Sequence, residues 1–207
     1  MLPQNMGSET NIKLPFSFIL FSLIALVFSQ ILLLVHGQLM ADGSFRIPVI
    51  WSSAHLLILG WALMAAMGAM YQLVPVAFLT KIWNERFAFI QFFHTAIGIT
   101  SFSVMLYWSP QNAMIPGVLT LLGILMFLFQ MFMTLKKQAK PTILTAFVGS
   151  SLVCLFITIS LGITLIYCLK TGIAGENYHS IFKAHLLMGV TGWFTLLIFG
   201  FSYKMVP

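Results

Sequence analysis

Histidines are the first candidates for chemistry in this chain, which holds five of them but only four acidic residues. His55 and His185 each follow an alanine and precede two leucines. Neutral imidazole is a common ligand of haem iron and of other metal ions. The two histidines are therefore candidate ligands of one haem or metal, and His94 is a further candidate metal ligand. The alternative is that each imidazole only hydrogen-bonds a neighbouring group.

The elements that must hold these side chains are membrane-spanning helices. The chain has 207 residues, of which 60% are hydrophobic and 7% charged, with a mean hydropathy of +1.01. Soluble domains carry roughly 25% charged residues, so this composition excludes a soluble globular protein. A crossing needs about 20 apolar residues and must satisfy its own backbone groups, which favours helices. Apolar runs predict spans at Pro15–Val35, Pro48–Val74, Phe87–Trp108, Pro116–Leu135, Thr142–Leu169 and Ile181–Met205.

The sequence thus predicts an all-α polytopic bundle of six transmembrane helices in a lipid bilayer. Residues 1–13 form a polar N-terminal segment, and residues 14–207 form a single transmembrane domain. Seven of the ten lysines and arginines fall in segments predicted to lie on the same side of the membrane as the N-terminus. Because positive charge is enriched in cytoplasmic loops, we expect a multi-pass cell-membrane protein with both termini cytoplasmic. The positive charges form no basic face, so nucleic acid is not an expected partner.

Two of the predicted spans share a repeat, in residues 54–75 and 184–207. Each copy contains Gly-Trp, six residues, Gly, two residues, Tyr, three residues and Pro. The matched residues are Gly60, Trp61, Gly68, Tyr71 and Pro75 in the first copy and Gly192, Trp193, Gly200, Tyr203 and Pro207 in the second. Since the copies lie four helices apart, they run in the same direction. The sequence predicts a parallel repeat with a period of four helices.

His55 and His185 occupy similar depths in these two spans, about 7 to 11 Å below the predicted outer edge. The gap from the histidine to Gly-Trp is two residues longer in the second copy. Two residues turn a helix by about 200°, so the histidines leave the shared frame on different faces. A single ligand held between the two helices would require histidines on different faces of the shared frame. None of the four acidic residues falls within a predicted span, which argues against a proton pump or proton-coupled transporter.

Methionines and cysteines offer weaker candidates. Met64, Met67 and Met70 are spaced three residues apart and could form a thioether track for Cu(I), although packing is the simpler interpretation. Cys154 and Cys168 fall in one apolar run at a spacing that fits no CxxC motif, so they are interpreted as packing residues.

The stretch from Ala54-His55 through Gly60-Trp61, Gly68 and Tyr71 resembles a helix of the catalytic subunit I of haem–copper oxidases. The resemblance is closest to the cbb-type oxidases and the related NnrS-like membrane proteins. In that family a His-x-His pair precedes Gly-Trp on this helix, and its second histidine ligates the low-spin haem b. That histidine corresponds to His55. The family's helices also recur with a period of four, so the resemblance implies a b-type haem held by His55 and His185.

The chain departs from the family pattern at the oxygen-reducing centre. The first histidine of the pair, a ligand of the high-spin haem, is replaced by Ser53, and Lys183 stands at that place in the second copy. The adjacent His-His pair of the family's copper site does not occur in the chain. The specific similarity covers roughly 45 residues of the two motif helices, which implies a family member shortened to about six helices or a piece of a longer chain.

The leading hypothesis is therefore a haem-binding membrane protein with a bis-histidine site for electron transfer or sensing, without independent oxygen or NO reductase activity. Its cofactor-binding residues would be His55, His185, Trp61, Trp193, Gly60 and Gly192, and its partners a redox protein or terminal oxidase subunits. One alternative is a haem- or copper-handling assembly factor for such an oxidase, with copper the less favoured cofactor. Another is a cofactor-free structural subunit. A homo-oligomer is compatible with each hypothesis.

Overall fold

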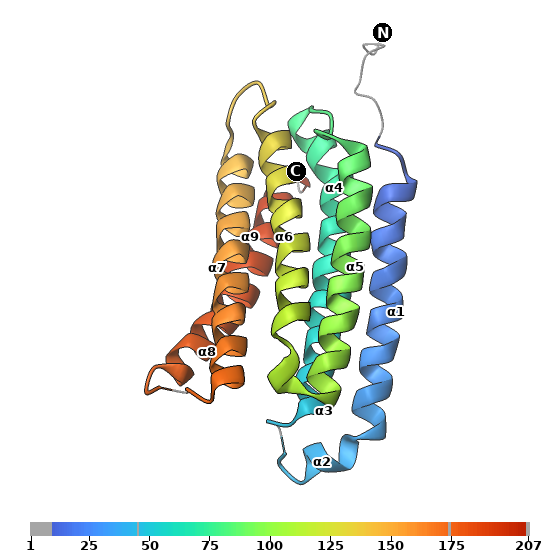
Figure 1. Cartoon of the computed structure of the whole chain (residues 1–207). Helices are drawn as coiled ribbons and strands as arrows, with labels where there is room; N and C mark the ends of the chain where they lie inside the picture. The colour runs from blue at the N-terminus through green and yellow to red at the C-terminus, as the bar shows by residue number, and fades with distance from the viewer. Residues whose placement is uncertain (1–9, 45, 174, 206–207) are drawn as a thin grey trace.

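The computed structural model describes residues 10–44, 46–173 and 175–205, which fold into a bundle of long helices (Figure 1). Six helical runs are long and apolar enough to cross a membrane. They are α1 (Lys13–Val35), α3–η1–α4 (Pro48–His55, Leu56–Leu63, Met64–Phe78), α5 (Glu85–Trp108), α6 (Met114–Leu135), α7 (Ile143–Thr171) and α8–η3–α9 (Tyr178–Leu187, Met188–Thr195, Leu196–Met205). Short helices α2 (Gly37–Ala41) and η2 (Pro110–Asn112) lie in the connections. The predicted all-α bundle of six spans is confirmed.

Several span boundaries differ from the predicted ones by a few residues. The second span, α3–η1–α4, continues past Val74 and through Pro75 to Phe78. It ends where Leu79 adopts a left-handed conformation with φ of 51°. A proline is tolerated within a membrane helix because neighbouring groups replace the lost hydrogen bond. The predicted N-terminal segment, residues 1–13, lies mostly outside the described residues, and so does Pro207 of the repeat.

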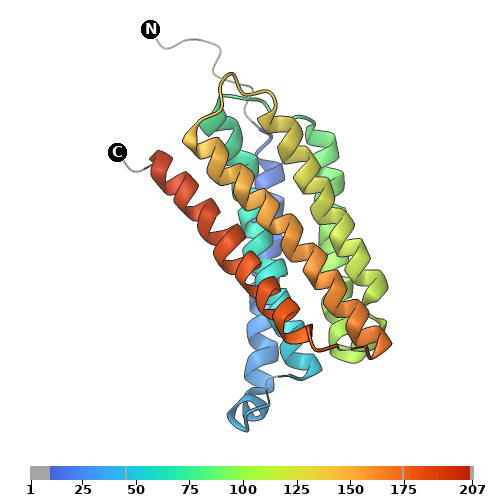
Figure 2. The same ribbon diagram turned by 90° about the vertical axis from the view of Figure 1, so that its left-hand side faces the viewer.

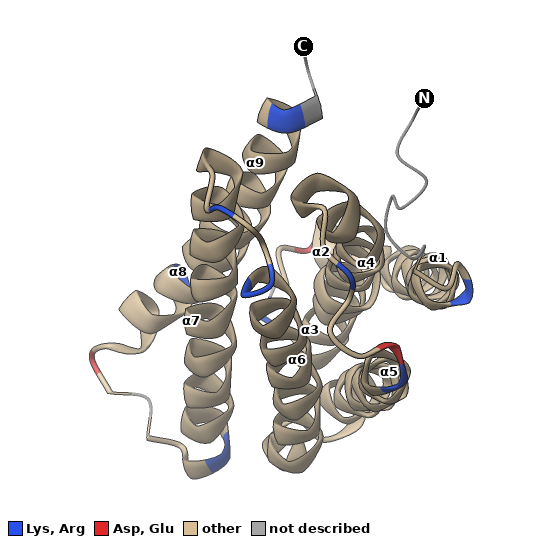
Figure 3. Cartoon of the chain, turned by 90° about the horizontal axis from the view of Figure 1, so that it is seen from above, with Lys and Arg blue, Asp and Glu red and all other residues tan. Residues whose placement is uncertain are grey.

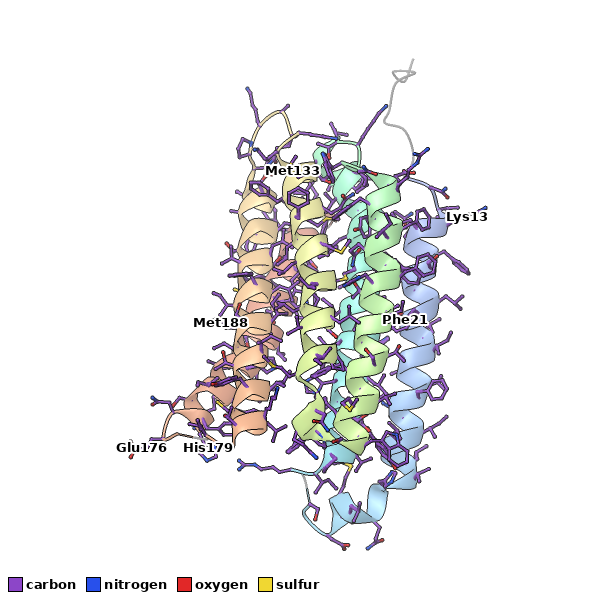
Figure 4. The ribbon with its side chains drawn as sticks, in the orientation of Figure 1. Lys13, Phe21, Met133, Glu176, His179 and Met188 are labelled. Atoms are coloured by element: carbon purple, nitrogen blue, oxygen red, sulfur yellow. The ribbon has the colours of Figure 1, made fainter. Side chains whose placement is uncertain are left out.

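The spans alternate in direction, so α1 begins and α9 ends at the same end of the bundle (Figures 1 and 2). We call this the terminal end and the opposite one the distal end. Lys13 marks the terminal end, whereas Glu176 and His179 lie at the distal end (Figure 4). Seen along the bundle axis, α1 and α5 occupy one side, α7 to α9 the other, and α6 lies between them (Figure 3).

Small residues allow the closest helix contacts. A Cβ atom at Gly98 of α5 would lie 2.8 Å from the backbone of Thr120 in α6. In return, a Cβ at Gly123 of α6 would lie 2.8 Å from Cα of Thr95 in α5. In a membrane, helices associate through such close packing because lipid tails are as apolar as the side chains. These glycines therefore fix the crossing of α5 and α6.

The sequence repeat extends to a pair of helices in the structure. Gly60 and Gly68 of the second span pack against Ala25 and Phe18 of α1, and their Cβ atoms would approach those side chains to 2.6 and 2.8 Å. The equivalent glycines of the sixth span, α8–η3–α9, pack in the same way against α7. Gly192 meets Cys154 at 2.9 Å, and Gly200 meets Phe147 at 2.8 Å.

A hydrogen bond repeats as well. Ser22 of α1 donates to the carbonyl of Ile19, and Ser151 of α7 donates to the carbonyl of Val148. Each serine lies four residues after the phenylalanine that meets the second motif glycine, Phe18 in α1 and Phe147 in α7. It also lies three residues before the small residue that meets the first motif glycine, Ala25 in α1 and Cys154 in α7. The repeated unit is therefore a helix pair, with α1 and the second span equivalent to α7 and the sixth span.

Both motif spans also contain a π-helical segment at the same place. η1 and η3 each have eight residues, and each begins four residues before the glycine of Gly-Trp. Well under 1% of residues in soluble proteins are π-helical, and such segments are frequent at functional sites. The matched π-helical segments support the repeat and place an unusual backbone directly after His55 and three residues after His185.

The two motif tyrosines differ in environment. Tyr71 is fully buried and donates to Gln91 Oε1 at 2.9 Å, while Gln91 Nε2 donates to Thr95 and to the sulfur of Met67. Tyr203 is 60% exposed. The buried hydroxyl is thus part of a polar network at the centre of the bundle, and its repeat equivalent is not.

This difference gives a matched pair of variants. We expect Tyr71→Phe to destabilise the fold by about 1 to 3 kcal/mol, because it leaves the buried Gln91 oxygen without a donor. Tyr203→Phe should change stability by no more than about 0.5 kcal/mol. Denaturant unfolding in detergent measures both changes, and equal effects of the two variants would contradict the assigned role of the network.

Candidate functional site

His55 lies at the end of α3, directly before η1, with its ring part-buried. Its Nδ1 lies 2.7 Å from the carbonyl oxygen of Trp51, one turn earlier on the same helix. The ring packs edge-on against Phe102 of α5, with centroids 5.2 Å apart. The carbonyl selects the tautomer with the proton on Nδ1, which leaves the lone pair on Nε2.

His185 lies in α8, three residues before η3. Its Nδ1 lies 2.9 Å from the carbonyl oxygen of Thr158, which belongs to the neighbouring helix α7. The ring fills the space left by Gly162 of α7, where an added Cβ would lie 3.1 Å from its Cε1. His185 is thus oriented by α7 through both a hydrogen bond and a close contact.

Trp51, one turn before His55, and Ile163 of α7, next to the Gly162 that borders His185, pack against the same buried apolar cluster. Within the described residues, Nε2 of neither ring has a hydrogen-bond partner. Histidines that ligate metals almost always donate their other N–H to a carbonyl, a carboxylate or water, which fixes the ring and raises its basicity. Both rings have this arrangement. The structure therefore places both histidines beside one cluster in the distal half of the bundle, each with Nδ1 bound to a carbonyl and Nε2 without a partner among the described residues.

Apolar side chains surround the pair. Phe102, Leu106 and Ala113 form a buried cluster with Ile166 of α7 at the distal half of the bundle. Trp51, whose carbonyl accepts from His55, packs against the same cluster. This environment is compatible with a hydrophobic ring such as a porphyrin.

A groove of about 620 Å³ lies farther toward the terminal end, between the second and sixth spans. These spans are not closely packed on each other along their described length. One wall has four alanines, at positions 62, 65, 66 and 69, and Trp61 stands at its distal end, opposite Phe194. Trp61 is six residues, about 9 Å, beyond His55. The groove has the volume of small-molecule sites, roughly 300 to 1,000 Å³.

The other predicted cofactor residues lie elsewhere. Gly60 and Gly192 face α1 and α7, so the structure places them in helix contacts. Trp193 is 3% exposed, and its buried Nε1 has no partner in the described chain. His94 lies on α5, about 13 Å from the start of that helix at the terminal end. Its buried Nε2 also has no partner among those residues.

The methionine track is part of the core. Met64, Met67 and Met70 are at most 1% exposed, and Met67 accepts a hydrogen bond from Gln91. Across residues 10–44, 46–173 and 175–205, no group of three or more His, Cys, Asp or Glu could hold a metal ion. Packing explains these methionines.

The sequence did not indicate the residues that orient the histidines. The carbonyl of Thr158 and the space at Gly162 come from α7, and nothing in their spacing links them to His185. Comparison with protein-family models, curated proteins and solved structures found no match for this chain.

Proposed function

We propose that this membrane protein binds one b-type haem between His55 and His185 for electron transfer or sensing. The observation that carries the proposal is the arrangement of two imidazoles beside one buried apolar cluster, each with Nδ1 bound to a backbone carbonyl and Nε2 free. A haem with two histidine ligands accepts and donates single electrons. The resemblance to haem–copper oxidases and NnrS-like proteins supports the same cofactor.

The residues around the site would hold the haem and exclude water. The carbonyls of Trp51 and Thr158 fix the tautomers, and Phe102 and Gly162 fix the ring positions. With two histidine ligands the iron is six-coordinate, so the site favours electron transfer or sensing over oxygen or NO reduction.

The orientation proposed from the charges places the terminal end in the cytoplasm of a cell and the histidine site near the outer face. The terminal end of the bundle carries Lys13, Lys81, Arg86, Lys136, Lys137, Lys140 and Lys204. The described positive residues of the distal end are Arg46, Lys170 and Lys183. This asymmetry supports the orientation by the positive-inside rule.

The absorption spectrum of dithionite-reduced, detergent-purified protein tests the function. We expect a sharp α-band and about one haem per chain, as two axial histidines in one site require. A protein without such a band after haem-replete expression would refute the proposal. Substoichiometric haem together with co-purification of an oxidase would instead favour the assembly-factor alternative.

A further inference from the structure

A second groove, separate from the histidine pair, lies between α1 and α5 in the distal half of the bundle. It has a volume of about 420 Å³ and is floored by the second span. We call it the α1–α5 groove. The residues that line it are Phe21, Ile24, Ala25, Phe28, Leu32, Ser52, Leu56, Thr100, Ser103, Val104, Tyr107 and Trp108.

The α1–α5 groove is closed at both ends and open toward the bilayer. Phe21, near the middle of α1 (Figure 4), packs edge-on against Phe92 at a centroid distance of 6.4 Å. At the distal end, His36 packs edge-on against Tyr107 at 6.1 Å. Between them, Phe28 is 58% exposed and Val104 51% exposed, so this side of the groove faces lipid. A ligand can therefore enter from the membrane.

The α5 wall of the groove holds an unsatisfied hydroxyl. Ser103 is 2% exposed, and its Oγ is buried without a hydrogen-bond partner in the described chain. Its carbonyl already accepts from Ser52. A buried hydroxyl without a partner costs free energy, which a ligand carbonyl in the groove would recover. The groove therefore matches an apolar molecule that carries a hydrogen-bonding oxygen.

Depth and shape identify the class of that molecule. Ser103 lies five residues, about 7.5 Å, inside Trp108, which marks the membrane interface. The ester carbonyls of phospholipids lie at the interface, whereas an uncharged quinone ring enters the hydrocarbon. Aromatic side chains of α1 and α5, among them Phe28 and Trp108, offer faces and edges on which a flat ring packs.

We propose that the α1–α5 groove binds the ring of a lipophilic quinone or quinol, with one ring oxygen hydrogen-bonded to Ser103. The groove adjoins the histidine site. Ser52 lies three residues before His55 on one helix, and Phe102, next to Ser103, contacts the His55 ring.

One consequence rests on the haem proposed above. A quinol bound here would be the electron donor: its conversion to quinone releases two electrons and two protons. The two electrons would be taken up by two ferric haems, each held by His55 and His185 of its own chain, and the two protons would be released to water.

Titration of the purified protein with a short-chain quinone, followed by quenching of tryptophan fluorescence, tests the binding. We expect saturable binding that Ser103→Ala weakens about 3- to 10-fold through the lost hydrogen bond. Ser101→Ala is the matched control, because that hydroxyl already donates to the carbonyl of Ile97 and faces away from the groove. Val104→Phe should fill the groove and remove saturable binding, whereas Val153→Phe, on the lipid-facing side of α7, should not.

Equal affinity in the wild type and in both groove variants would overturn the proposal. So would complete displacement of the quinone by a monoacylglycerol, which would assign the groove to lipid. The groove proposal is separated from the haem proposal by repeating the titration on the double variant His55→Ala/His185→Ala, which lacks both proposed haem ligands. Quinone binding that this variant retains supports the groove proposal independently of the haem. A wild-type protein that shows the haem spectrum but binds no quinone would overturn only the groove proposal.

Discussion

Replacing either His55 or His185 with Ala is expected to abolish the sharp α-band of the reduced protein. Each ring has one free Nε2, so under the haem proposal each variant would lose one of the two residues that would hold the haem iron. His36→Ala is the control, because the His36 ring contacts Tyr107 and bonds its own helix at Leu32, away from the pair. Its spectrum should match that of the wild type.

Imidazole rescue separates ligation from a structural role. A glycine at position 55 or 185 leaves space for free imidazole to bind at the iron. Added imidazole should restore the α-band of either glycine variant and should not alter the His36→Ala spectrum. A band that persists unchanged in His55→Ala or His185→Ala would show that the histidine is not a ligand.

The number and position of the spans could be predicted from the sequence because membrane insertion leaves a direct compositional trace. Uninterrupted apolar runs of about 20 residues have few other structural solutions. The end of the second span was missed, since Pro75 reads as a helix breaker. The structure shows that the helix ends only at Leu79, where the backbone turns left-handed.

The repeat predicts similar depths for His55 and His185, and the structure has both in the distal half of the second and sixth spans. The details of the site could not be predicted. A π-helical segment depends on backbone hydrogen bonds from residue i to i+5, which apolar patterning does not report. Trp61 and Trp193 hold the same position in the repeat, so the sequence does not distinguish their environments. In the structure Trp61 is 39% exposed beside a groove, whereas Trp193 is buried.

Gly162 is the residue whose replacement should most directly move His185 without touching the ligand itself. A Cβ at Gly162 would lie 3.1 Å from Cε1 and 3.5 Å from Nδ1 of the His185 ring. Alanine requires a ring shift of only a few tenths of an ångström, so we expect a slight loss of haem affinity. Valine adds two methyl groups and must push the ring away from the Thr158 carbonyl, so Gly162→Val should lower haem affinity about 10- to 100-fold.

The matched control lies on the same helix. A Cβ at Gly149 of α7 meets no atom within 4 Å, so Gly149→Val adds the same methyl groups without displacing a neighbour. Haem titration of the three variants, with circular dichroism to show that each is folded, measures the effect. The order wild type, Gly162→Ala, Gly162→Val in decreasing affinity is expected, with Gly149→Val equal to the wild type. If Gly162→Val keeps wild-type affinity while folded, α7 does not position His185, and the haem would have to be held by another face of the sixth span.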